Sequence, residues 1–227
     1  MTLNDLDLQG KRALVRVDFN VPLDDARNVT DATRIRRAIP TINALLDGGT
    51  SVVLMSHLGR PKGPSADLSL KHIVPTLTEL LGRPVKFAED CVGDKALEVT
   101  QALQPGEVAL LENLRFYSEE KAGDEFFAGQ LAESGDVYVN DAFGTAHRAH
   151  ASTAVIAKFF PEDKAFGLLM QGEVEALNKV LSTPAKPLLA IIGGAKVSSK
   201  LSILENLVDR VDKLIVGGGM AYTFVKA

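Results

Sequence analysis

The chain has 227 residues, of which 46% are hydrophobic and 24% charged, an ordinary composition for a globular protein. Its net charge of −4 argues against general nucleic-acid binding, because such proteins carry an excess of basic residues, so any cationic site must be local. No apolar run is long enough to cross a bilayer, no signal-peptide core is present, and Cys91 has no second cysteine, which together predict a cytoplasmic protein without membrane contact.

Buried strands alternate with helices along the chain. Continuous apolar or β-branched runs, typical of strands buried on both faces of a parallel sheet, occur at 13–17, 51–55, 85–87, 108–111, 137–139, 188–192 and 214–216. Helical patterns occur at 31–47, 69–81, 120–133, 171–181 and 198–208. The alternation predicts an α/β fold with a doubly wound parallel sheet, in which ligands bind beyond the carboxyl ends of the strands.

Polar and cationic residues follow four of the predicted strands. In chain order they are Asp18, Asn20, His57, Arg60, Arg115 and Arg148. One arginine after a strand is commonly a solvated surface charge, but here three strands place an arginine near the same sheet edge. Because a guanidinium offers a planar, bidentate fork, this pattern suits a phosphate or carboxylate. Asp18 and Asn20 add hydroxyl-binding groups, so the predicted ligand is a small hydroxylated acid.

The helix predicted at 31–47 adds Arg34, which flanks its apolar stripe in the first turn and can turn toward the sheet edge. Arg36 and Arg37 point further away and are interpreted as solvated charges. A metal site at Asp141, His147 and His150 is disfavoured, because their spacing supplies no clear third ligand. Cys91 has no supporting signature for a nucleophile, and His72 is interpreted as a structural residue of a helix.

The segment 168–181 has amphipathic helical spacing and precedes a proline-bearing connector at 182–187. It marks either a domain boundary or a routine helix and loop within one domain. Two later strands each run into glycines, first Gly193 and Gly194, then Gly217 to Gly219. Glycines allow a phosphate to approach the backbone, and free amides at a helix start favour an anion. Lys196 and Lys200 are four residues apart and face the same way on a helix, although the Walker spacing is absent.

Six segments in order resemble the signature sequences of the phosphoglycerate kinase family. They are VRVDFNVPL, SHLGRP, LLENLRF, DAFGTAHRAHAS, GGAKVSSKL and VGGGMAYTF. The resemblance covers the whole chain and implies two Rossmann-like domains joined by a helix. It implies reversible, magnesium-dependent phosphoryl transfer between 1,3-bisphosphoglycerate and ADP, giving 3-phosphoglycerate and ATP. Positioning and charge neutralisation would carry the reaction without a protein nucleophile, and domain closure would bring the substrates together.

Site residues follow from the resemblance position by position. The 3-phosphoglycerate site would comprise Asp18, Asn20, Arg34, His57, Arg60, Arg115 and Arg148. The nucleotide site would comprise Gly193, Gly194, Ala195, Lys196, Lys200, Gly217, Gly218 and Gly219. Arg34 and Lys196 would be catalytic, because Arg34 would steady the transferring phosphoryl group and Lys196 would lie nearest to it.

The resemblance also divides the chain. Residues 1–167 would bind the acid, 168–187 would form the interdomain helix and linker, and 188–227 would begin the nucleotide domain. The family's chain runs on beyond this point, and that part would carry the ligand of Mg²⁺, so this stretch has no expected metal ligand and is predicted to be inactive alone. The complete protein would be a monomer. The alternative is a non-catalytic anion-binding module, against which the paired lysines Lys196 and Lys200 argue.

Overall fold

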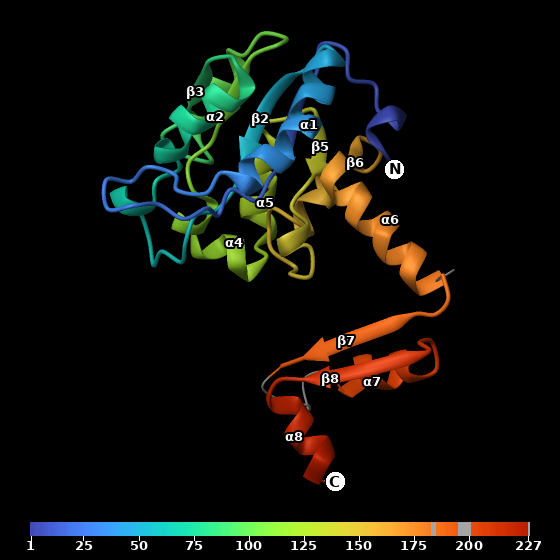
Figure 1. The fold of residues 1–227 in the computed structure, drawn as a ribbon. Coiled ribbons are helices and arrows are strands. Elements are labelled where there is room, and N and C mark those ends of the chain that lie inside the picture. Colours follow the sequence, from blue (N-terminus) through green and yellow to red (C-terminus); the bar gives the residue numbers. More distant parts are fainter. Residues whose placement is uncertain (183–184, 195–200, 227) are drawn as a thin grey trace. The chain divides into compact units, whose positions relative to one another are not determined.

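The structure is a computed structural model that describes residues 1–182, 185–194 and 201–226, and it divides into two compact units, Met1–Glu173 and Val174–Ala227 (Figure 1). The boundary falls within helix α6 (Leu168–Ser182), the helix that the sequence analysis assigns to the connection between domains. The assignment of a binding role to each part of the chain stays a prediction. No helix in the described ranges combines the length and apolar character needed to span a bilayer.

The first unit is built on a six-stranded sheet in which all pairs are parallel, in the order β3-β4-β2-β1-β5-β6 (Figure 1). The strands are β1 (Arg12–Arg16), β2 (Ser51–Met55), β3 (Val85–Phe87), β4 (Val108–Leu110), β5 (Val137–Asn140) and β6 (Lys164–Phe166). Leu14 of β1 is in register with Val53 of β2 and Tyr138 of β5. Because the strands are parallel, all their carboxyl ends lie at one edge, and the α/β fold class is confirmed.

Helices cover both faces of this sheet (Figure 1). They are α1 (Thr33–Asp47), α2 (Val74–Leu81), α3 (Asp94–Gln101), α4 (Ser118–Ala122), α5 (Glu125–Ala132) and the start of α6. Val15 belongs to one buried apolar cluster with Ile42 of α1, whereas Leu14 belongs to a second with Leu131 of α5. Successive residues of a strand point to opposite faces, which is why one apolar run serves two cores.

Four parts of the chain differ from the sequence-based expectation. Strand β6 and helix α3 were not predicted, because β6 is three residues long with a lysine, and α3 is a two-turn helix with a mixed pattern. The helix predicted at 120–133 is two helices, α4 and α5. Gly123 ends α4 with a left-handed φ of 68°, and the Asp124 side chain then caps α5 by accepting from Phe127 N at 2.8 Å. The segment 70–73 is a 3₁₀ turn that precedes α2.

The second unit contains a parallel pair of strands, β7 (Leu189–Gly193) and β8 (Lys213–Gly217), with helices α7 (Leu201–Val208) and α8 (Gly219–Lys226). The register pairs Gly193 with Gly217, so the two glycine-bearing strand ends lie side by side. The sequence pattern predicts that the α7 helix begins at 198, but residues 198–200 lie outside the described part of the chain.

Adjacent phenylalanines on α5 provide a test of the packing. Phe127 is 2% exposed and belongs to the core, whereas Phe126 is 77% exposed. We expect Phe127→Ala to lower the free energy of unfolding by about 3–5 kcal/mol, because it removes buried apolar contacts and leaves a cavity. Phe126→Ala, the matched control, should change it by less than about 0.5 kcal/mol. Urea denaturation measures both, and equal losses would contradict the assignment of the buried face.

Candidate functional site

A cavity of about 260 Å³ opens at the carboxyl ends of the strands in the first unit. All seven residues predicted for the acid site line it, namely Asp18, Asn20, Arg34, His57, Arg60, Arg115 and Arg148. They come from the segments that follow β1, β2, β4 and β5, and from the first turn of α1. The structure therefore brings together residues that are up to 130 positions apart (148 − 18) in the sequence.

The loop after β2 is held in place by residues of the cavity itself. Asn20 Oδ1 accepts a hydrogen bond from Gly59 N at 2.8 Å, and Arg115 donates to Gly59 O at 2.7 Å. Gly59 has a φ of 64°, and a Cβ there would lie 2.9 Å from Leu68 Cδ2. Glycine is favoured at this position, because another residue would bring backbone strain and would displace the Leu68 side chain. The sequence pattern His-Leu-Gly-Arg is thus a fixed loop whose Arg60 borders the cavity.

The cavity is strongly cationic. Among the residues that the structure describes, four arginines line it and one carboxylate, that of Asp18, opposes them. Asp18 Oδ2 lies 2.6 Å from Arg34 Nη1, and the Arg34 side chain remains 51% exposed. Burial is the main cause that lowers the pKa of the Arg115 guanidinium, and repulsion from Arg148 adds to it. Such mutual repulsion is relieved by an anion, so the cavity suits a ligand with more than one negative charge.

His57 contributes a neutral group to this cationic cavity. Its side chain is 4% exposed, and its Nδ1 lies 3.0 Å from Arg16 Nη2. Burial, followed by the charges of Arg16 and Arg115, lowers the pKa of His57 to about 2. The imidazole is therefore uncharged at physiological pH and can serve as a hydrogen-bond donor or acceptor rather than as a cation.

Some residues of the site were not singled out from the sequence. Gly144 lines the cavity, and a Cβ there would lie 3.0 Å from Asp18 Oδ2, so glycine leaves room for that carboxylate. Thr145 also lines the cavity. Arg16 ends β1 with its side chain 1% exposed and contacts His57. An arginine inside a buried strand was the available signal for Arg16, because a buried charge requires partners.

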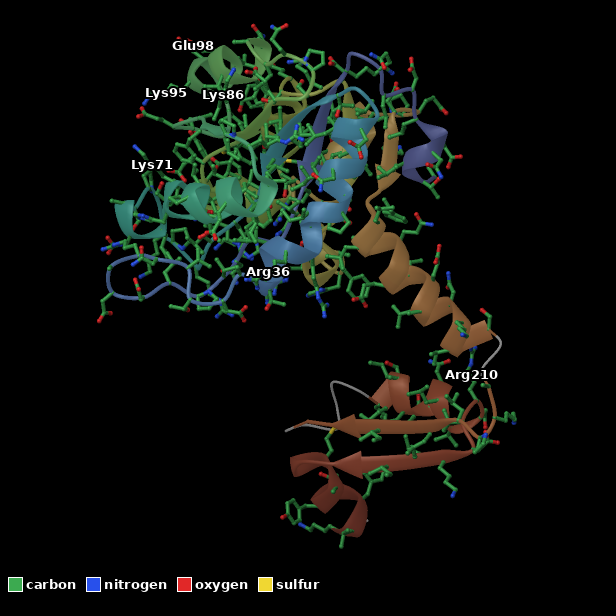
Figure 2. The ribbon with its side chains drawn as sticks, turned by 45° about the horizontal axis from the view of Figure 1, so that its top comes forward. Arg36, Lys71, Lys86, Lys95, Glu98 and Arg210 are labelled. Carbon is green, nitrogen blue, oxygen red and sulfur yellow. The ribbon has the colours of Figure 1, made fainter. Side chains whose placement is uncertain are left out.

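The three arginines of α1 differ from each other in position. Arg36, which Figure 2 labels, is exposed and lines neither this cavity nor the adjoining one. Arg37, however, lines an adjoining cavity of about 210 Å³ together with Asp18 and Arg34. Arg37 is exposed, as expected for a solvated charge, and it does not line the cavity of the acid site, but it lies one helix turn from Arg34 and borders the adjoining cavity. Arg36 is therefore the suitable control for Arg34.

The glycines predicted for the nucleotide site meet at the ends of β7 and β8. A Cβ on Gly218 would lie 3.1 Å from Gly194 N, and Gly218 has a φ of 66°. Met220 N, in the first turn of α8, donates to Gly194 O at 2.9 Å. Gly219 begins α8, and Gly193 and Gly217 end the paired strands. Ala195, Lys196 and Lys200 lie outside the described residues.

Among the described residues, no group of three or more His, Cys, Asp or Glu is arranged to hold a metal ion. His147 Nε2 accepts from Arg148 Nε at 3.2 Å, and Asp141 Oδ1 accepts from Met170 N at 3.0 Å in the first turn of α6. Asp141 thus anchors the start of α6. Cys91 is fully buried, and burial raises the pKa of its thiol, so it is not a reactive thiolate at neutral pH.

The neutral state of His57 predicts a pH-dependent stability. Below pH 6.5 the unfolded His57 gains a proton, whereas the folded one stays neutral down to about pH 2, so acid favours unfolding. Two pH units below 6.5, the free energy of unfolding is lowered by up to about 2.7 kcal/mol through this one histidine. His57→Asn keeps an acceptor for Arg16 and should flatten this acid slope. His72→Asn, at a partly exposed histidine, should keep the wild-type slope. Urea denaturation at stepped pH measures it, and an unchanged slope in His57→Asn would contradict the assignment.

Comparison with known proteins agrees with the fold. The family profile described as phosphoglycerate kinase matches residues 3–227. The chain is 58% identical over 228 residues to the phosphoglycerate kinase of Moorella thermoacetica, covering 100% of this chain and 57% of that protein. It is 56% identical over 229 residues to that of Anaeromyxobacter dehalogenans, with 100% and 58% covered.

Solved structures give the same result. The phosphoglycerate kinase of Coxiella burnetii superposes with a TM-score of 0.87 at 40% identity, covering 100% of this chain and 56% of that one. The enzyme of Pyrococcus horikoshii OT3 gives a TM-score of 0.86 at 35% identity, with 100% and 57% covered. The chain spans a little over half the length of these relatives. It belongs to the phosphoglycerate kinase family.

Proposed function

We propose that the chain supplies the acid-binding half, and the start of the nucleotide-binding half, of a phosphoglycerate kinase. The reaction is reversible phosphoryl transfer between 1,3-bisphosphoglycerate and ADP, which gives 3-phosphoglycerate and ATP. One observation carries the proposal: seven side chains from five separate segments gather around a single cationic cavity at the sheet edge. Family membership supports it, and the cytoplasmic location and monomeric state expected from the sequence belong to the same proposal.

The lining chemistry matches 3-phosphoglycerate group by group. The ligand carries a phosphate, a carboxylate and one hydroxyl. Arg60, Arg115 and Arg148 offer guanidinium forks to its anionic groups, and His57 offers an uncharged donor. Asp18 and Asn20 present oxygens and an amide that suit the hydroxyl. A cavity of about 260 Å³ is large enough for a molecule of this size.

Arg34 would serve the reacting phosphoryl group. It stands in the first turn of α1 and is half exposed. Among the described residues its side chain pairs with Asp18 through Nη1, which leaves its other donors available to a ligand. Positive charge at this point would stabilise the negative charge on the phosphoryl oxygens in the transition state. Lys196 and Lys200 would meet the nucleotide phosphates, and Gly193, Gly194, Ala195 and the glycines Gly217 to Gly219 would let those phosphates approach the backbone.

Magnesium belongs to the proposal only as the ion that accompanies ATP or ADP. When bound, it neutralises phosphate charge. The described residues form no metal-binding group, and every step assigned to this chain is binding, orientation or charge stabilisation by its own side chains. The division into an acid-binding part at 1–167, a connector at 168–187 and a nucleotide-binding part from 188 is proposed on the same basis.

The proposal predicts that this chain binds 3-phosphoglycerate without nucleotide. Because the contacts are ionic, raising the salt concentration from low to physiological strength should weaken the binding. Calorimetry on the folded chain measures it, with Arg60→Ala as the weakened variant and Arg36→Ala as the unaffected control. Absence of binding at low ionic strength, in a sample shown to be folded by circular dichroism, would reject the acid-site assignment.

A second prediction separates binding from catalysis. In a complete phosphoglycerate kinase that carries this segment, Arg34→Ala should lower kcat far more than it raises KM, because its role is greatest in the transition state. Arg36→Ala, two positions along the same helix at an exposed residue that lines neither cavity, should leave both constants near those of the parent. Steady-state kinetics of ATP formation measures both, and equal losses at the two positions would show that the effect comes from helix disruption or general charge.

A further inference from the structure

A buried polar chain starts at His57 of the acid site and leads to Glu120, and its other three members have no place in the function described so far. His57 lies in the loop after β2, and Arg16 ends β1. Ser152 lies in the segment that follows β5, and Glu120 belongs to α4. The Glu120 and Ser152 side chains are fully buried, and Arg16 is 1% exposed. Arg16 Nη2 lies 3.0 Å from His57 Nδ1, Arg16 Nε donates to Ser152 Oγ at 2.9 Å, and Ser152 Oγ donates to Glu120 Oε1 at 2.6 Å.

The chemistry of the four side chains determines which of them donates and which accepts in the buried polar chain. A guanidinium has only donors, so His57 Nδ1 must accept, and the proton of the neutral ring must lie on Nε2. The Ser152 hydroxyl accepts from Arg16 and therefore gives its own proton to Glu120. Glu120 Oε2 accepts a second bond, from Ser152 N at 3.0 Å, which fixes the carboxylate in orientation. Arg16 therefore donates in two directions, to His57 Nδ1 and to Ser152 Oγ, and Ser152 in turn donates to the Glu120 carboxylate.

Electrostatics gives Glu120 a role at the site. Arg16 is fully buried, which lowers the pKa of its guanidinium, and the charge of Glu120 is the largest influence that opposes this effect. Asp18 and Tyr138 act in the same direction. A buried guanidinium without a compensating carboxylate would be costly, so Glu120 stabilises the buried charge of Arg16 and, through Ser152, holds it in place.

His57 in turn faces positive charge from four elements. Arg16 on β1, Arg115 after β4, Arg148 after β5 and Arg34 on α1 all disfavour its protonation. With Nδ1 committed to Arg16, Nε2 is the ring nitrogen left to meet a ligand in the cavity that His57 lines. An N–H at that nitrogen suits an anionic oxygen, whereas the opposite tautomer would present a lone pair and repel it.

We propose that Glu120 is a positioning residue of the acid site. Through Ser152 and Arg16 it holds His57 in the tautomer with the proton on Nε2, so that the imidazole meets the bound acid as a neutral donor. The contact between His57 and the bound acid rests on the proposed function. The tautomer itself is a property of the free protein and can be measured without any ligand.

The first measurement is nitrogen NMR of the histidine rings in the free 227-residue chain, with the His57 signals assigned by their loss in His57→Asn. We expect a protonated Nε2 and an accepting Nδ1, unchanged from about pH 8 down to about pH 5, a range in which an ordinary histidine titrates. A proton on Nδ1, or titration of His57 within that range, would overturn the proposal. This measurement needs no substitution in the buried chain, so it stands even if a variant folds poorly.

The second measurement uses Ser152→Ala and Glu120→Gln, with Glu119→Gln as the matched control, since Glu119 is the exposed neighbour on the same helix. Ser152→Ala keeps the Glu120 carboxylate but removes the hydroxyl that links it to Arg16, so it is the deciding variant. In both variants we expect Arg16 to lose its support and move away from His57 Nδ1, which gives mixed His57 tautomers. The affinity for 3-phosphoglycerate should then be lower by about tenfold, the effect of one charge-assisted hydrogen bond. Glu119→Gln should match the wild type in both readouts.

The outcomes separate the two proposals. If the wild type does not bind 3-phosphoglycerate in calorimetry but shows the Nε2–H tautomer and loses it in Ser152→Ala, the function is rejected and the positioning of His57 by this chain of contacts is upheld. If the wild type binds, and Ser152→Ala retains both the tautomer and the affinity, Glu120 does not act through Ser152 and the inference fails. A purely structural role would lower the melting temperature of the variants without changing the His57 tautomer, and that result also overturns it.

Discussion

The common direction of β1, β2, β4 and β5 is the constraint on which the rest of the molecule depends. Because both faces of the sheet are buried under helices, the strand interiors must be almost wholly apolar, and polar side chains can gather only beyond the strand ends. Parallel strands place those ends at one edge. The four segments that leave this edge therefore converge, and with the first turn of α1 they enclose the cationic cavity.

Concentrating arginines in one cavity has an electrostatic cost that the structure meets in three ways. Asp18 pairs with Arg34 and leaves that side chain half exposed, which limits desolvation. His57 stays neutral, because burial and the surrounding guanidinium groups lower its pKa, and so adds a donor without adding charge. Glu120 supplies a negative charge below the cavity, where it compensates Arg16 but cannot itself contact a ligand in the way that Asp18 can. The cavity thus stays attractive to anions without an unpaired buried cation beneath it.

The break between α4 and α5 places Glu120 where this compensation is possible. Gly123 ends α4, and a Cβ there would lie 2.6 Å from Ala149 O, so the glycine admits the segment that carries Ser152. The Glu120 carbonyl accepts from Ala151 N at 2.9 Å, while its side chain holds Ser152. One short helix therefore holds the segment after β5 against the sheet edge, and that segment also delivers Arg148 to the cavity.

The sequence by itself determined the alternation of strands and helices and the residues at each strand end, because period and apolar runs are local properties. From these follow the α/β class and the meeting of Asp18, His57 and Arg115 at one edge. Short elements such as β6 and α3 were not predicted, because so few residues give too weak a periodic pattern. Only the tertiary structure decided the partners of Arg16, because Glu120 and Ser152 lie more than 100 positions away along the chain (120 − 16 and 152 − 16). Such pairings depend on strand register and on how loops pack, and neither can be predicted from the local spacing of residues.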